Sequence, residues 1–322
     1  MDLEREQSSV ITGVGIHTGR NFIVRISTNP EVEGINFYSE HFQKRYESPA
    51  SWTRLSGTAR STALVLRGED NLRFELRTVE HFLAAAHVLG LEGVDVFVRS
   101  SGSLIHSSDF QTLELPVLDG SARQWIRFIQ EYQIRENRVI KTLGRKVFKV
   151  HRSFELKDGL KCIALLPPRS GEESMTRYSC AVDFGSAWQQ EAEFSINWMD
   201  PKSAVKNFGE KIAPARTFGF QAELKDLEDR GLAKGAALNN AILLDGDRVV
   251  NEGGLLFPNE LAAHKLVDAI GDFALAGRPI IGQIEVTRGG HAAHLRALSE
   301  AVKSGVLISG YLNSTGCFSP ES

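Results

Sequence analysis

The pattern of apolar and polar positions predicts short strands with a few helices set among them. Residues 9–30 have the pattern of a hairpin, in which a glycine-containing turn precedes the alternating stretch NFIVRIST. From Arg77 the chain changes to TVEHFLAAAHVLG, where apolar side chains recur at helical spacing until Gly90 ends the helix. The stretch VDVFVR (94–99) then alternates as a strand, and ARQWIRFIQEY has the apolar spacing of a second helix.

The second half of the chain has a similar mixture of elements. Strand patterns occupy 146–156 and 160–167, and a long helix is expected at about 259–276, before the strand RPIIGQIEVTR and a final helix. Neither half shows the regular alternation of a doubly wound sheet. We therefore predict an α+β fold of two domains, each a two-layer sandwich of sheet and helices. The expected divisions are an N-terminal domain at 1–136, a C-terminal domain at 137–305 and a frayed tail at 306–322.

Length, composition and charge narrow the class of protein. A chain of 322 residues, 42% hydrophobic and 24% charged, is typical of a globular protein with two domains of roughly 150 residues. The net charge is −3 and both signs are mixed along the chain, so no basic face predicts nucleic-acid binding. No apolar run approaches about 18 residues, and MDLEREQSSV lacks the features of a signal peptide. We expect a cytoplasmic protein without a membrane-spanning segment or an obligate protein partner.

The cysteines do not predict a disulfide framework or a thiolate metal site. Cys162, Cys180 and Cys317 are widely spaced and form no C-x-x-C pair. Any metal must therefore be held by histidines and carboxylates.

The segment LAAHKLVDAIGD offers two such ligands. His264 and Asp268 are four residues apart, so on a helix they project from one face, one turn apart. An imidazole with a carboxylate suits Zn²⁺, or Fe²⁺ in the same site. A surface ion pair has the same spacing, and spacing alone does not separate the two interpretations.

The segment TVEH places Glu80 and His81 at the start of an otherwise apolar helix. A carboxylate and an imidazole in a largely buried position need partners, because unpaired buried charge is costly. Neighbouring helical residues point about 100° apart, so one of the two can bind a metal while the other reaches a water. Metal hydrolysis in H-E-x-x-H helices works in this way. Alternatively, Glu80 only complements the helix dipole.

The segment TRGGHAAH is the third candidate. Gly289 and Gly290 allow a close backbone approach just before His291, and an imidazole there is a reasonable general acid. We expect His294, three residues later, to be a solvent-facing helix residue.

Seven segments of the chain form one ordered set: GVGIHTG (13–19), TVEHFLAA (78–85), ELPVLDGSA (114–122), ARTFGF (215–220), RGLAKGAALNNAILL (230–244), VVNEGGLLF (249–257) and HKLVDAIGD (264–272). Together, and in this order, they resemble one enzyme family, UDP-3-O-acyl-N-acetylglucosamine deacetylase, a zinc enzyme that commits bacteria with an outer membrane to lipid A synthesis. The resemblance implies that family's two-domain fold, with the active site at the junction of the domains.

The resemblance also implies the centre of the site. His81, His264 and Asp268 match the family's zinc ligands, with water in the fourth position. Glu80 matches the general base that deprotonates this water. His291 matches the residue that is charged during catalysis and protonates the leaving amine.

Further residues match groups around this centre. Thr217 matches the hydroxyl that stabilises the oxyanion. Asp272 matches the carboxylate that orients the catalytic histidine. Lys265 matches a basic residue facing the substrate. Lys161 resembles the lysine that contacts the sugar nucleotide, and Phe184 resembles the aromatic ring that stacks on uracil.

Residues 217–244 predict a strand, a short helix and a second strand. The apolar stripe Phe218, Phe220, Leu224 and Leu227 fits ordinary core packing. In the family that the chain resembles, an insert at 217–244 forms the channel for the substrate's acyl chain. The implied substrate is UDP-3-O-acyl-GlcNAc. Alternatives are a paralogue that deacetylates another sugar nucleotide, or a non-catalytic relative.

The chain departs from the family pattern in three places. Lys234 stands where an apolar residue is frequent, which would narrow or shorten the acyl channel. The segment after His291 lacks the asparagines of many members, and the loop at 99–116 is longer than usual.

Overall fold

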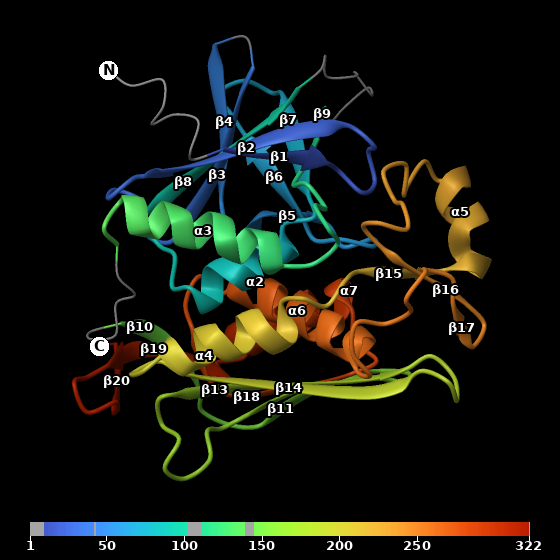
Figure 1. Cartoon of the computed structure of the whole chain (residues 1–322). Helices are drawn as coiled ribbons and strands as arrows, with labels where there is room; N and C mark the ends of the chain where they lie inside the picture. Colours follow the sequence, from blue (N-terminus) through green and yellow to red (C-terminus); the bar gives the residue numbers. More distant parts are fainter. Residues whose placement is uncertain (1–9, 42, 102–110, 139–144, 322) are drawn as a thin grey trace.

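The structure, a computed structural model, describes residues 10–41, 43–101, 111–138 and 145–321. They form two large sheets with helices packed between them, so that the layers follow the order sheet, helices, helices, sheet, and a third sheet of three strands lies beside these layers (Figure 1). The strands of the first sheet end at residue 114, and those of the second begin at residue 146. This confirms the predicted α+β fold of two two-layer domains.

The first sheet is mixed parallel and antiparallel. Its strands are β1 (Val10–Val14), β2 (Asn21–Thr28), β3 (Ile35–His41), β4 (Lys44–Pro49), β5 (Leu55–Gly57), β6 (Ala63–Arg67), β7 (Arg73–Arg77), β8 (Val94–Ser100) and β9 (Gln111–Glu114). They lie in the order β1-β2-β8-β3-β4-β6-β7-β9, with β5 on β6. β1 and β2 form the predicted hairpin. In β2, the buried Phe22, Val24 and Ile26 alternate with more exposed residues, as expected for a sheet covered on one face.

The second sheet is arranged around β18. Its strands are β10 (Lys146–Val150), β11 (Phe154–Asp158), β12 (Lys161–Leu166), β13 (Met175–Asp183), β14 (Gln189–Asn197), β18 (Ile280–Thr287), β19 (Leu307–Leu312) and β20 (Phe318–Pro320). β18 pairs with β10 and β13 in parallel and with β12 antiparallel. The alternating burial along β13 again leaves one face of the sheet toward solvent.

The prediction of a frayed tail at 306–322 is wrong for the residues that the structure describes. β19 pairs antiparallel with β10, and β20 pairs with β19. Leu307 and Leu312 are buried there, so apolar burial holds the end of the chain in the sheet. Of the loop expected at 99–116, residues 102–110 lie outside the described part, and residues 111–114 form β9, parallel to β7.

Two helices of the first domain face the helices of the second. The former are α2 (Glu80–Val88) and α3 (Arg123–Arg135); the latter are α4 (Lys202–Asn207) with a π-helical turn (Phe208–Ile212), α6 (Glu260–Ala274) and α7 (His291–Lys303). The three buried alanines of α2, residues 84–86, keep this helix thin where it is enclosed. Gly271 of α6 lies directly against α2, because a Cβ atom there would be 2.0 Å from the carbonyl oxygen of Glu80. This contact sets how closely the two helices approach.

The predicted insert lies at one side of this layered body (right in Figure 1). Its elements are β15 (Phe218–Phe220), a 3₁₀ turn (Gln221–Glu223), α5 (Leu224–Asp229) and β16 (Ile242–Asp245), and β17 (Arg248–Val249) follows beyond the predicted bounds of 217–244. The predicted strand, helix and strand are present, and β15 and β16 are parallel. Among the described helices, none has the length and apolar character needed to cross a membrane.

Candidate active site

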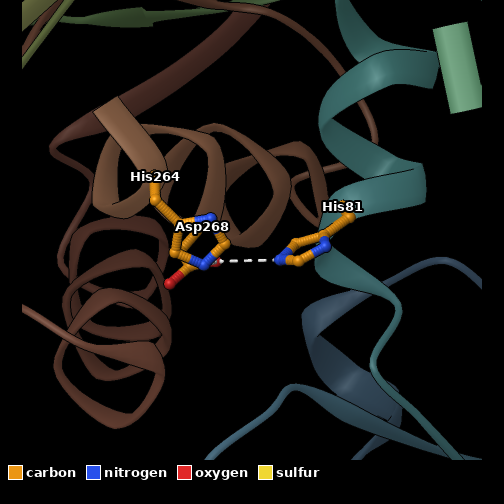
Figure 2. Close-up of side chains that lie close together, drawn as sticks. All are labelled: His81, His264 and Asp268. Atoms are coloured by element: carbon orange, nitrogen blue, oxygen red, sulfur yellow. Dashed lines mark ion pairs between the residues drawn. The ribbon is translucent and has the colours of Figure 1, made fainter. Parts of the chain in front are cut away.

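His81, His264 and Asp268 meet between α2 and α6 (Figure 2). Oδ1 of Asp268 lies 3.5 Å from Nε2 of each histidine. The two imidazole rings stand at 88° to one another with centroids 5.0 Å apart, and all three side chains are almost fully buried. One ligand atom from each residue lies within 4.8 Å of the other two, which is a spacing that a single cation can bridge.

The protonation states suit metal binding. Nδ1 of His264 lies 3.2 Å from the carbonyl oxygen of Ala215, so Nδ1–H donates and the Nε2 lone pair faces the cluster. Burial, only partly opposed by Asp268, lowers the pKa of His264 to about 3, which keeps the imidazole neutral. Burial opposes ionisation of Asp268, but Lys265 and His264 lower its pKa well below 3.8. Neutral imidazole and ionised carboxylate are the forms that bind metals.

Glu80 and His291 lie beside this cluster and face each other. Oε2 of Glu80 accepts a hydrogen bond from the backbone N–H of Thr62, and Oε1 lies 3.9 Å from Nε2 of His291. Burial raises the pKa of Glu80, while His291 and His81 oppose the shift. For His291, burial is outweighed by Asp272 and Glu80, which raise its pKa to about 10. The pair therefore combines a carboxyl group whose ionisation burial opposes with an imidazole that is protonated near neutral pH.

A second group with metal-ligand spacing shares Asp268 and contains Glu80 and His291. It suits a cation less well than the first group. His291 carries a proton on Nδ1 for Asp272 and, with its raised pKa, a second proton on Nε2 near neutral pH. A cationic imidazolium has no lone pair for a metal.

Asp272 is hydrogen-bonded to His291 and to Thr62. Its Oδ2 accepts from Nδ1 of His291 at 2.9 Å, and its Oδ1 accepts from the hydroxyl of Thr62 at 2.5 Å. The prediction that His294 faces solvent is wrong: the side chain is 1% exposed, and its Nδ1 donates to Oδ2 of Asp272 at 2.8 Å. On α7, residues three apart share a face, so His294 follows His291 onto α6.

A cavity of about 570 Å³ opens from this cluster. Thr217, Lys265 and Lys161 line it, and their roles toward a substrate stay predictions. Nζ of Lys265 lies 2.9 Å from Oδ2 of Asp268 and 5.2 Å from the centre of the Phe218 ring. Lys265 therefore neutralises part of the negative charge of the cluster.

The apolar part of the cavity is formed by the insert. Phe218, Leu224 and Leu227 line it together with Ala236 and Ile242. The insert therefore faces the cavity with much of its predicted stripe.

Phe184 and Phe220, two aromatic residues predicted to bind substrate, lie next to this cavity but are not among the described residues that line it. The rings of Phe184 and Phe220 pack edge-on at 5.3 Å, and Phe184 packs on Phe218 at 5.5 Å. Phe184 remains 37% exposed. Lys234 is likewise absent from the described lining, and its backbone N–H donates to the carbonyl oxygen of His17.

Sequence reasoning missed two buried residues that organise the site. Thr62 contacts Glu80, Asp272 and His291 at once, yet it lies in no recognisable motif. Glu114 is fully buried and accepts from the backbone N–H of His17 at 2.9 Å, which explains why the turn GVGIHTG wraps around it. Glu114 belongs to a segment that carries the resemblance and Thr62 to none, and no local signal pairs residues so far apart in the chain.

Two α+β domains enclose a carboxyl group, a protonated imidazole and a group of metal-binding type, an arrangement that hydrolases use. A profile of the family LpxC, described as UDP-3-O-acyl N-acetylglycosamine deacetylase, matches residues 5–303. The chain belongs to this deacetylase family.

Individual relatives agree with this assignment. The UDP-3-O-acyl-N-acetylglucosamine deacetylase of Myxococcus xanthus is 32% identical over 282 residues, covering 88% of this chain and 80% of that protein. The protein of the same name from Thermodesulfovibrio yellowstonii is 32% identical over 295 residues, 92% of this chain and 89% of its own. That from Syntrophotalea carbinolica is 29% identical over 319 residues, 95% and 93% of the two chains.

Proposed function

We propose that this protein hydrolyses the N-acetyl group of UDP-3-O-acyl-N-acetylglucosamine and releases acetate, in lipid A synthesis. The observation that carries the proposal is that Glu80, His291 and the cluster around Asp268 lie together and line one partly apolar cavity. Family membership and the names of the relatives support this choice of substrate.

In this proposal His81, His264 and Asp268 hold Zn²⁺, and Fe²⁺ suits the same donors. The fit rests on two observations: the Nε2 lone pair of His264 faces the cluster, and Asp268 is ionised. When bound, the ion lowers the pKa of water to roughly 7 and polarises the acetyl carbonyl group.

The residues of the chain supply the proton transfers. Glu80 takes a proton from the attacking water, and the hydrogen bond from Thr62 fixes its carboxylate for this task. The hydroxyl of Thr217 donates to the developing oxyanion, a contact typically worth about 3 kcal/mol of barrier. His291 then gives the Nε2 proton to the leaving amine, while Asp272 holds its Nδ1. Without that protonation the C–N bond would not break readily.

The rest of the cavity lining suits the other parts of the proposed substrate. A fatty chain against Phe218, Leu224 and Leu227 gains about 0.8 kcal/mol for each buried methylene. Lys161 at the cavity wall suits the sugar-nucleotide part. The exposed face of Phe184 suits a stacked uracil ring.

The direct test is to incubate the purified, metal-loaded protein with UDP-3-O-acyl-GlcNAc and to measure acetate. We expect acetate in equal amount to the free amine formed. Absence of both products, from folded protein with metal bound, would reject the proposed function.

A further inference from the structure

Asp272 accepts hydrogen bonds from two histidines. Its Oδ2 lies 2.9 Å from Nδ1 of His291 and 2.8 Å from Nδ1 of His294, while Oδ1 accepts from Thr62. Because an ionised carboxylate only accepts, each imidazole presents Nδ1–H to the same oxygen. The proposed reaction uses His291 and Asp272, but it gives no task to His294.

His294 is a donor through Nδ1 alone. In the described part of the chain its buried Nε2 has no hydrogen-bond partner. A hydrogen on Nε2 would therefore be a buried, unsatisfied donor, so the hydrogen-bond geometry favours the hydrogen on Nδ1.

Gly289 provides the space for this second imidazole. A Cβ atom at residue 289 would lie 2.6 Å from Nε2 of His294 and 2.3 Å from Cγ1 of Val286, so no side chain fits there. The ring of His294 is 1% exposed, with the ring of Phe273 at 6.1 Å. The imidazole is thus enclosed on several sides and holds its Nδ1–H in one direction.

We propose that His294 is a positioning residue for His291. By donating to Oδ2 of Asp272, it prevents the carboxylate from rotating and keeps that oxygen toward Nδ1 of His291. His291 is then held with Nε2 toward Glu80 and the cavity. The catalytic consequence rests on the proposed function, whereas the hydrogen-bond chain from His294 to His291 does not.

Two variants of the zinc-loaded enzyme separate the donor from the bulk of the ring. His294→Asn keeps an N–H on the atom next to Cγ, and His294→Leu removes the donor at similar volume. We expect His294→Leu to lower kcat about tenfold to a hundredfold with KM within twofold, because misplacing a catalytic group by about 1 Å has effects of this size. His294→Asn should stay within about threefold of the original kcat. A Leu variant with unchanged kcat, or an equal loss in both variants, overturns the proposal.

His87→Leu is the matched control. His87 lies on α2, and the structure places it against Tyr178 and Trp198, away from Asp272. Its replacement should leave kcat unchanged.

A measurement that does not depend on catalytic turnover distinguishes this inference from the proposed function. The Nδ1–H proton of His291, observed by NMR of ¹⁵N-labelled protein, should shift in His294→Leu and stay in place in His294→Asn and His87→Leu. If the protein releases no acetate, the proposed function fails, and this resonance alone decides the positioning role. An unchanged resonance in His294→Leu overturns it. Should the Leu variant not fold, His294→Met is the second donor-free variant, since Met adapts to irregular gaps.

Discussion

Nε2 of His81 lies 3.5 Å from Oδ1 of Asp268, although the two residues belong to helices of different domains. Neither domain alone contains the cluster, so the site exists only while α2 and α6 remain in contact. That contact is close because α6 carries Gly271 where the backbone of Glu80 crosses it. The stability of the junction and the geometry of the site are therefore coupled.

Metal dependence is the first prediction. Treatment with a chelator should abolish acetate release, and added Zn²⁺ should restore it. His81→Ala should lower the bound zinc measured by elemental analysis, because one of the three proposed side-chain ligands is lost. Full activity in the metal-free protein would contradict this prediction.

Glu80 should act as a base and not as a ligand. Glu80→Ala should lower kcat by about 10²–10⁴-fold, the usual contribution of a general base, while the zinc content stays the same. The measurement pairs steady-state kinetics with metal analysis of the same sample. Loss of zinc from this variant would instead make Glu80 a ligand, as in the second group that contains His291.

Gly271→Ala tests the junction itself. The new methyl group would lie 2.0 Å from the carbonyl oxygen of Glu80, so α2 and α6 must separate. Overpacking of this kind costs typically about 1–3 kcal/mol, and we expect a lower Tm together with weaker zinc binding.

Gly209→Ala is the control for this substitution, because a Cβ atom there meets only Cδ1 of Ile126, at 3.9 Å. It should leave Tm and zinc affinity unchanged. If Gly271→Ala behaves like this control, the close approach of the helices does not determine the site.

The pH dependence of kcat should report the Asp272–His291 pair. Asp272 and Glu80 raise the pKa of His291 from 6.5 to about 10, so the required acid is present below that range and is lost as pH rises through it. A metal ion bound beside His291 would lower the pKa of its imidazole, but Asp272 would still raise this pKa. Asp272→Asn should therefore move the alkaline limb of kcat to lower pH. An unmoved limb would mean that His291 is not the acid.

The pKa shifts of His291 and Asp272 also predict how the stability of the fold depends on pH. His291 has a raised pKa, so its contribution to stability is complete below about 6.5 and is lost as pH rises through about 10. Asp272 has a pKa lowered from 3.8 to about 2, because His291 outweighs the effect of burial. Its contribution is present above 3.8 and is lost as pH falls toward 2. The metal-free Tm of Asp272→Asn and of the original protein should converge at low pH, as thermal melts at several pH values would reveal.

The acyl channel is tested by a charge in its wall. Leu224→Asp should lower kcat/KM for the acylated substrate by at least tenfold and should hardly change it for UDP-GlcNAc, which has no chain to bury. Leu160→Asp, at a position that is 73% exposed, is the control and should change neither value. Equal kcat/KM for the two substrates in the original protein would favour a paralogue with another sugar nucleotide.

Local patterns in the sequence were sufficient for most of the elements. The hairpin at 9–30, the helix that begins at Glu80 and the long helix that carries His264 all lie close to their predicted positions. Periodicity of apolar side chains depends on neighbouring residues alone, and for that reason it can be recognised without the fold. The i, i+4 spacing of His264 and Asp268 is likewise a local pattern that can be recognised without the fold. The resemblance added His81 and His291 as partners, and their catalytic roles stay predictions.

Only the tertiary structure decided the contacts across long stretches of chain. Thr62 reaches Asp272 and His291, Glu114 binds the turn at His17, and His294 turns inward where solvent was expected. The end of the chain joins a sheet instead of fraying, because β10 offers an edge on which its leucines are buried. Such contacts depend on how closely whole elements pack, which Gly271 and Gly289 permit through the absence of a side chain. A glycine in the sequence shows that space is available, and the fold determines which neighbour fills it.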